Sequence, residues 1–207
     1  MINKLSLLLA KKLCRDGKID KDEIDLYSYG LFVLISQILL LSVTIIFGLT
    51  LSCAFESIVF YASFQSIRKF AGGYHASTET RCEIMSTLSI LVCVILIRLS
   101  NTYSYQSALL FLTLFAAVCI FLVCPLDTPE KPLSEEEFTQ FRKISRIILF
   151  VITIITFFSA VFKITFLLYP TCLSLILESI LLIAGKIKQS KLKEKDDREE
   201  SLRSISP

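Results

Sequence analysis

Long apolar runs separated by short polar segments make up most of this chain. A membrane-spanning helix needs about 20 largely apolar residues, and four runs are clear candidates: residues 29–51, 84–99, 105–126 and 144–162. Two weaker runs, 54–67 and 164–184, carry Glu56 and Glu178 respectively. The second also holds Pro170, whose missing N–H would kink a helix. The pattern predicts an all-α membrane protein.

The basic residues favour six spans over four. Several Lys and Arg residues lie in the N-terminal segment, in the link after residue 67, in the link before residue 144 and in the C-terminal tail. The links near residues 52–54 and 100–104 hold none, and the link near 163 holds only Lys163. Because cytoplasmic links carry an excess of Lys and Arg, six transmembrane helices with both termini cytoplasmic fit every link.

On this topology the chain forms a single domain with three parts. We expect an amphipathic N-terminal segment over residues 1–28, a helical membrane core over 29–184 and a charged cytoplasmic tail over 185–207. We expect no cleaved signal peptide, because the first short apolar run ends in lysines and not in a small-residue cleavage pattern. The tail, from residue 186 onward, is either a solvated helix or disordered.

Local patterns predict two helix starts outside the apolar runs. Four leucines recur at helical spacing among lysines over residues 3–15, which predicts an amphipathic helix lying on an anionic leaflet. A frayed tail ahead of the first span is the alternative. Further along, Ser134 followed three residues later by Glu137 has the form of a capping box, which begins a helix.

The composition supports a membrane protein and excludes some other classes. Of 207 residues, 54% are hydrophobic, and the mean hydropathy is +0.66, whereas soluble domains average about 45–50% apolar. A net charge of +3, with the basic residues gathered in links, disfavours nucleic-acid binding. Most of the seven cysteines lie in apolar runs as small hydrophobes. Without a CxxC or paired Cys/His spacing, we expect no metal site and no cofactor.

The chain's only histidine, His75, lies seven residues before Cys82, between the second and third runs. A thiolate is the reactive form of cysteine, so this pair suggests a nucleophile with its base. Thr80 and Glu83 have the spacing of a capping box, which would place Cys82 in a first helical turn, where the dipole favours a thiolate. Seven residues of continuous helix rise about 10 Å, so direct proton transfer requires a bend between the two.

Neighbouring residues have a functional and a purely structural interpretation. Glu79 would orient the imidazole of His75, or would form only an exposed pair with it. The N–H groups of Gly72 and Gly73 would stabilise an oxyanion, or the glycines form only a turn. Arg68 would bind a carboxylate, or would only anchor the second span at the headgroups. An interfacial histidine is itself more often a surface residue than a base.

Two segments resemble a known family. Residues 68–76, Arg68-Lys69-Phe70-Ala71-Gly72-Gly73-Tyr74-His75-Ala76, together with Cys82, closely resemble a motif of the AgrB family of bacterial membrane endopeptidases. Residues 124–133, Cys124-Pro125-Leu126-Asp127-Thr128-Pro129-Glu130-Lys131-Pro132-Leu133, resemble that family's second recognisable segment. Length, span count, the amphipathic N-terminal segment and the basic links also fit, so the resemblance covers nearly the whole chain.

The resemblance implies a cysteine endopeptidase, a hydrolase of peptide bonds in the cell membrane of a Gram-positive bacterium. Such an enzyme processes a small AgrD-like propeptide for quorum sensing, through a thioester acyl-enzyme that cyclises to a thiolactone or lactone. By motif match His75 is the base and Cys82 the nucleophile, while Arg68 and Gly73 support the site. Lys131 matches the second segment. A homodimer is also implied.

Basic residues of the cytoplasmic links would attract an acidic propeptide tail, and we expect Lys131, Arg142 and Lys143 to bind this substrate. The rival class is a non-enzymatic membrane transporter, or an export component for a small peptide, which would use polar groups within or beside the spans: Glu56, Arg98, Lys163 and Glu178. A catalytically idle paralogue with a scaffold role is a third interpretation.

Overall fold

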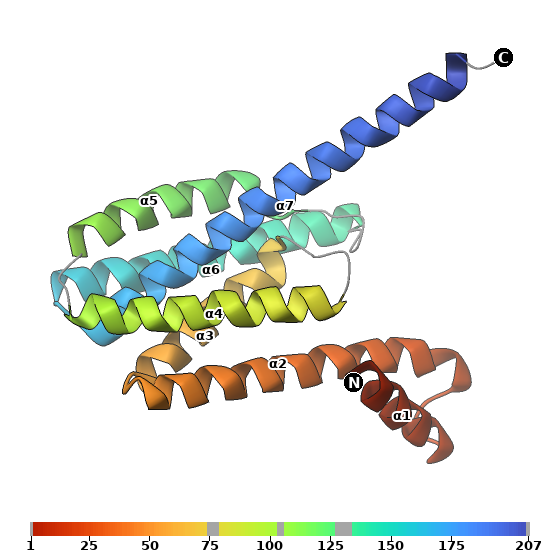
Figure 1. Ribbon diagram of the computed structural model, residues 1–207, viewed down its shortest axis with the longest axis horizontal. Helices are drawn as coiled ribbons and strands as arrows, with labels where there is room; N and C mark the ends of the chain where they lie inside the picture. Colours follow the sequence, from red (N-terminus) through yellow and green to blue (C-terminus); the bar gives the residue numbers. More distant parts are fainter. Residues whose placement is uncertain (1, 74–78, 103–105, 127–133, 206–207) are drawn as a thin grey trace.

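The computed structural model describes residues 2–73, 79–102, 106–126 and 134–205. These residues form helices and short connections, without a strand among them, which confirms the all-α prediction. The helices, seen in Figure 1, are α1 (Ile2–Arg15), the 3-10 helix η1 (Lys21–Glu23), α2 (Ile24–Thr50), α3 (Ala54–Ala71), α4 (Glu79–Thr102), α5 (Gln106–Val123), α6 (Glu135–Val161) and α7 (Thr165–Ile205).

Five of the described helices are long and apolar enough to cross a membrane. They include α2, α4, α5, α6 and the first part of α7. Helix α3 is too polar to meet this criterion, although it is as long as α5, at 18 residues. Its polar and charged side chains lower its hydropathy, and the described part of the chain therefore has one apolar span fewer than the six predicted.

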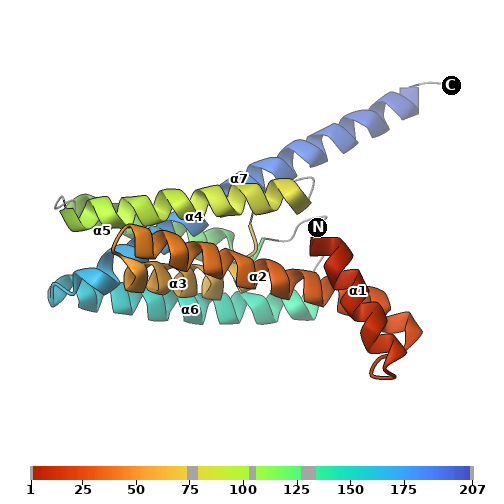
Figure 2. The ribbon, with the colours of Figure 1, turned by 60° about the horizontal axis from the view of Figure 1, so that its bottom comes forward.

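Helix α3 lies inside the bundle. It packs against α2, α4, α6 and α7, and Figure 2 shows it between α2 and α6. Its residues Phe60, Ile67 and Ala71 are fully buried. A helix that is covered by protein on several sides needs less apolar surface than one facing lipid, which accounts for the polar composition of α3.

Helix α7 is the other central element. It packs against α3, α4, α5 and α6, and its C-terminal half extends beyond the bundle (Figures 1 and 2). It continues through Pro170 as a single helix to Ile205, so of the two interpretations of the tail the helical one is confirmed that far. In α5 and α6, by contrast, large apolar side chains point outward: Phe111 is 75% exposed and Phe157 is 71% exposed.

Contacts between helix ends define two ends of the bundle. At one end, the rings of Phe70 in α3 and Phe141 in α6 meet edge to face at 5.6 Å. At the other end, Phe55 and Phe166, near the starts of α3 and α7, meet at 5.5 Å. The first of these is called the motif end below, because residues 68–73 and 124–126 lie there.

The helix boundaries confirm most local predictions. Helix α1 covers the predicted residues 3–15, and its Leu5 and Leu8 are exposed. Helix α6 begins after Ser134, whose Oγ accepts the N–H of Glu137 at 3.2 Å while the Glu137 carboxylate accepts the N–H of Ser134 at 3.0 Å. The capping box at Ser134 is therefore confirmed.

The apolar run over residues 105–126 ends as a helix earlier than predicted. Helix α5 stops at Val123, and the following Cys124–Pro125 peptide bond is cis. Proline lacks the N–H that the next helical hydrogen bond needs, and its ring clashes with the preceding turn. Hydropathy alone does not register that local restriction, so it overestimates the length of this helix.

Candidate functional site

The two segments singled out in the sequence meet at the motif end. The N–H of Leu126 donates a hydrogen bond of 2.9 Å to the carbonyl oxygen of Ala71. Ala71 and Cys124 are buried, and they belong to one apolar cluster with Leu149 of α6 and Leu175 of α7. The end of α3, the link after α5, and helices α6 and α7 therefore converge on one point.

The turn after α3 depends on both of its glycines. Gly72 has φ +79° and Gly73 has φ +133°, a region that residues with a Cβ rarely adopt. A Cβ on Gly72 would lie 2.8 Å from the carbonyl oxygen of Leu126, and one on Gly73 would overlap the guanidinium of Arg68. Helix α3 ends at these glycines, and backbone and side chain pack tightly against them.

Arg68 holds this turn from within α3. Its Nη1 donates to the carbonyl oxygen of Gly72 at 2.7 Å, and the N–H of Gly72 donates to the carbonyl oxygen of Arg68 at 3.2 Å. The side chain of Arg68 is only 17% exposed. Arg68 thus contacts the turn that leads toward His75, and is more than a headgroup anchor.

A carboxylate from α7 faces the same guanidinium. Oε2 of Glu178 lies 3.9 Å from Nη1 of Arg68, and the side chain of Glu178 is fully buried. Among the described residues, neither carboxylate oxygen has a hydrogen-bond partner. Sequence reasoning considered Glu178 only as a polar group of a transporter. The available signal was a carboxylate inside an apolar run, which marks a functional position by default.

Cys124 is a buried cysteine of the second segment. Its thiol donates to the Oγ of Ser145 in α6 at 2.8 Å, and that hydroxyl donates in turn to the carbonyl oxygen of Phe141. Cys124 is 4% exposed and Ser145 is 1% exposed. This hydrogen bond connects the link after α5 to α6.

Cys82 lies at the start of α4, but the predicted cap is wrong. Helix α4 begins at Glu79, so Thr80 lies inside the first turn and not at the N-cap. An Oε1 atom of Glu83 accepts the hydroxyl of Ser36 in α2 at 3.1 Å, a tertiary contact that the local pattern does not reveal. Cys82 is still the fourth residue of the helix, and the first four N–H groups of a helix have no intrahelical partner.

Other predicted site residues are only partly described. His75 and Lys131 lie outside the described residues, as do the side chains of Glu79 and Cys82. Arg142 and Lys143 are exposed on α6, directly after Phe141, whose ring contacts Phe70 beside the turn. These two basic residues therefore lie at the motif end.

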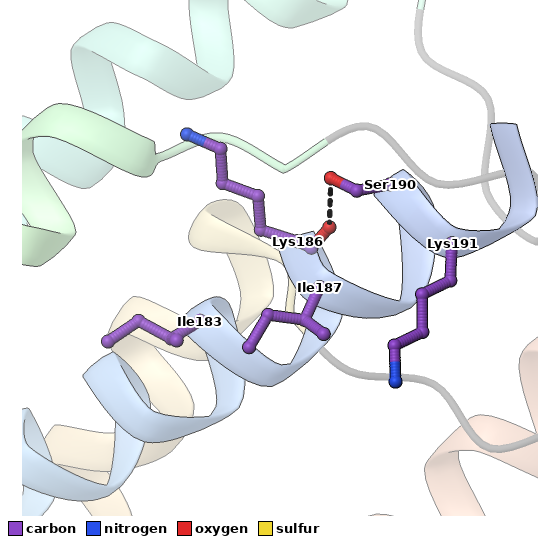
Figure 3. A pocket seen from close by; sticks show the side chains of 5 residues that line it. All are labelled: Ile183, Lys186, Ile187, Ser190 and Lys191. Carbon is purple, nitrogen blue, oxygen red and sulfur yellow. Dashed lines mark hydrogen bonds between the residues drawn. The ribbon is translucent and has the colours of Figure 1, made fainter. Parts of the chain in front are cut away.

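The surface of α7 carries a hollow near the end of its apolar part. It is lined by Ile183, Lys186, Ile187, Ser190 and Lys191. Figure 3 shows that the two lysine side chains point away from each other, so they do not converge on one ligand. Among the described residues, no group of three His, Cys, Asp or Glu side chains is placed to hold a metal ion.

The apolar helices of this chain form the bundle of a multi-pass membrane protein. The two segments that meet at its motif end form the candidate site. The family model described as accessory gene regulator B, AgrB, matches residues 5–182. The chain belongs to this family, and the resemblance seen in its two segments is confirmed.

Relatives from Clostridium perfringens carry the same family name. An AgrB-like protein 2 of strain 13 is 24% identical over 143 residues, which are 66% of this chain and 66% of the relative. A protein of strain SM101 has the same identity and coverage. An AgrB-like protein 1 of strain 13 is 29% identical over 175 residues, 82% of this chain and 89% of the relative. The match thus spans about two thirds of the first two relatives. No solved structure matches this chain.

Proposed function

We propose that this chain is a membrane cysteine endopeptidase that cleaves an AgrD-like propeptide for quorum sensing in a Gram-positive bacterium. The observation that carries the proposal is the hydrogen bond between Leu126 and Ala71, which joins the family's two segments into one unit. Membership of the AgrB family supplies the substrate class.

The proposed topology has six spans with both termini cytoplasmic. It adds α3 to the five apolar helices. Charge supports it: among the described residues, the motif end carries Arg68, Lys69, Arg142 and Lys143, whereas the opposite end carries Arg98 and Lys163. Basic residues favour the cytoplasmic side. The motif end, with Cys82 at the start of α4, would then face the cytoplasm, where a newly made propeptide is available.

The reaction divides into an acylation and a cyclisation. His75 takes the proton of the Cys82 thiol, and the thiolate attacks the carbonyl carbon of the scissile peptide bond. The C–N bond breaks as His75 protonates the leaving amine, and the N-terminal part of the propeptide remains as a thioester on Cys82. A thiol or hydroxyl of that peptide then attacks the thioester, and the released Cys82 sulfur recovers a proton.

The surroundings of the site favour cyclisation over hydrolysis. Water competes with the peptide's own nucleophile for the thioester, and a site at a membrane boundary limits its access. Forming a thioester from an amide is uphill, so removal of the cleaved C-terminal fragment would pull the reaction forward. Free N–H groups in the first turn of α4 would stabilise the thiolate of Cys82.

Other residues would support or bind the substrate. Arg68 and the turn at Gly72 and Gly73 would set the path of the chain toward His75, whose imidazole Glu79 would orient. An acidic propeptide tail would bind the basic residues of the two cytoplasmic links, among them Lys131, Arg142 and Lys143. We further propose that the enzyme works as a homodimer.

Alanine substitutions test the two reacting groups. In cells that co-express an AgrD-like propeptide, Cys82→Ala and His75→Ala should each abolish cleavage while the protein stays membrane-inserted. Cys82→Ser should be much weaker than wild type, because a hydroxyl ionises far less readily than a thiol. Cleavage that persists in Cys82→Ala would contradict the proposed mechanism and favour a transporter or export role.

A further inference from the structure

We infer that Glu178 is a positioning residue of this site: from α7 it orients Arg68 and, through Arg68, the turn at Gly72 and Gly73. The inference rests on the proposed function and extends it to a helix that neither family segment includes. Its effect on the reacting groups is proposed to pass through Arg68, which Glu178 faces at 3.9 Å.

The packing of α7 fixes where the carboxylate lies. Leu175 and Leu182 lie three residues before and four residues after Glu178, so all three share one face of α7. Both leucines are at most 1% exposed, and they belong to the same apolar cluster as Ile67 and Ala71 of α3. Because that face is locked against α3, the carboxylate of Glu178 has little freedom to move away from Arg68.

One guanidinium nitrogen links α7 to the turn. Nη1 of Arg68 lies 3.9 Å from Oε2 of Glu178 and 2.7 Å from the carbonyl oxygen of Gly72, to which it donates. A Cβ at Gly73 would overlap the same guanidinium. The position of Arg68 therefore sets the geometry of the last described residues before His75, and Glu178 is a charged group that faces it.

Stability alone is a poor reason to keep this carboxylate. Burying charged groups carries a large desolvation cost in proteins, and replacing a buried pair by apolar residues is often neutral or stabilising. Glu178 has no described hydrogen-bond partner that would offset this cost. An orienting role for Arg68, whose planar guanidinium has directed donors, explains a carboxylate at this position.

The competing explanation is that the pair only neutralises two buried charges. The two explanations differ for a double variant. Arg68→Gln alone leaves the buried carboxylate of Glu178 without this guanidinium, and Glu178→Gln alone removes this carboxylate from Arg68; each change should destabilise the protein. Together they leave no charge, so both explanations predict that the double variant regains thermal stability. Only the neutralising explanation predicts that it regains cleavage as well.

The experiment uses the full-length protein in detergent with a synthetic AgrD-like propeptide. It compares Glu178→Gln, Glu178→Asp and the double variant Arg68→Gln with Glu178→Gln. Glu56→Gln is the matched control, since Glu56 lies in the first turn of α3, at the opposite end of that helix. The measurements are kcat and KM, the melting temperature, and hydrogen exchange of the peptide covering residues 68–73.

For Glu178→Gln we expect kcat to fall about 10- to 100-fold, the size of effect that a small misplacement of reacting groups produces, with KM nearly unchanged. Exchange in residues 68–73 should become faster. Glu178→Asp, which keeps the charge, should recover part of the cleavage, and Glu56→Gln should behave as wild type. The double variant should melt close to wild type and still fail to cleave.

Two results would overturn the inference. One is a Glu178→Gln variant whose kcat and hydrogen exchange equal those of the wild type. The other is a double variant that cleaves the propeptide normally. If the wild-type protein itself cleaves no propeptide, the proposed function fails. Hydrogen exchange then tests separately whether Glu178 holds the turn. Unchanged exchange at residues 68–73 in Glu178→Gln would show that the carboxylate does not hold the turn.

Discussion

The backbone N–H of Leu126 donates to the carbonyl oxygen of Ala71 over 2.9 Å. Ala71 is the last residue of α3, and Leu126 follows the cis Cys124–Pro125 bond after α5. Far apart in the sequence, the two residues join the family's two segments at the motif end. A substitution that displaces either of these two backbone groups should therefore disturb the other segment.

Gly72→Ala should destabilise the protein and reduce cleavage. The new Cβ would lie 2.8 Å from the carbonyl oxygen of Leu126, on a residue with φ +79°. A strained backbone conformation costs about 1–3 kcal/mol, and relieving the strain would separate the two segments. The measurements are the melting temperature in detergent and the rate of propeptide cleavage.

Gly30→Ala is the control for this substitution. Gly30 lies in α2, and a Cβ there would meet nothing within 4 Å. Alanine has a higher helix propensity than glycine by about 1 kcal/mol, so this variant should be as stable as wild type or slightly more stable. Equal melting temperatures for Gly72→Ala and Gly30→Ala would contradict the close approach of Leu126 to the turn.

Cys124→Ala should leave propeptide cleavage nearly unchanged. The thiol is buried and donates to Ser145, so we expect it to be a structural contact and not the nucleophile. Removing it costs the hydrogen bond, about 0.5–1.5 kcal/mol, which should appear as a modest drop in melting temperature. Set beside Cys82→Ala, this variant shows whether loss of cleavage follows one particular cysteine. Abolished cleavage in Cys124→Ala would place the reactive thiol in the second segment.

Reporter cysteines at two exposed lysines test the orientation of α6. Lys143 lies in the N-terminal part of α6, Lys163 lies two residues after the C-terminal end of this helix, and both are exposed. In intact cells, a membrane-impermeant thiol reagent should label Lys163→Cys and not Lys143→Cys, because the motif end is proposed to be cytoplasmic.

The parent protein, treated with the same reagent, gives the background from native cysteines. After the cells are broken, both reporters should react. Labelling of Lys143→Cys alone in intact cells would invert the topology, and labelling of both would mean that α6 does not separate the two sides.

The sequence predicted those features that depend on neighbouring residues. The helix after Ser134 begins with the expected capping box because both of its hydrogen bonds join residues within one turn. The long apolar runs became helices because apolar side chains over about 20 residues suffice for a span. The motif turn at Gly72 and Gly73 was likewise anticipated from two adjacent glycines.

Predictions failed, or were not made, where the local structure depends on a contact with a residue that is distant in the sequence. The pattern from Thr80 to Glu83 suggested a cap, but Glu83 pairs with Ser36 of α2 and the helix begins at Glu79. Helix α3 is polar for a span because its neighbours bury it. No spacing in the chain indicated that Glu178 faces Arg68.

By itself, then, the sequence determined the helices, the site segment and the family, because local hydrogen bonding, hydropathy and motif residues are properties of short stretches. Only the tertiary structure decided that Leu126 meets Ala71 and that α7 supplies the carboxylate facing Arg68. Those contacts arise from the packing of α3 against α6 and α7 in one buried cluster, and packing depends on side chains that are remote along the chain.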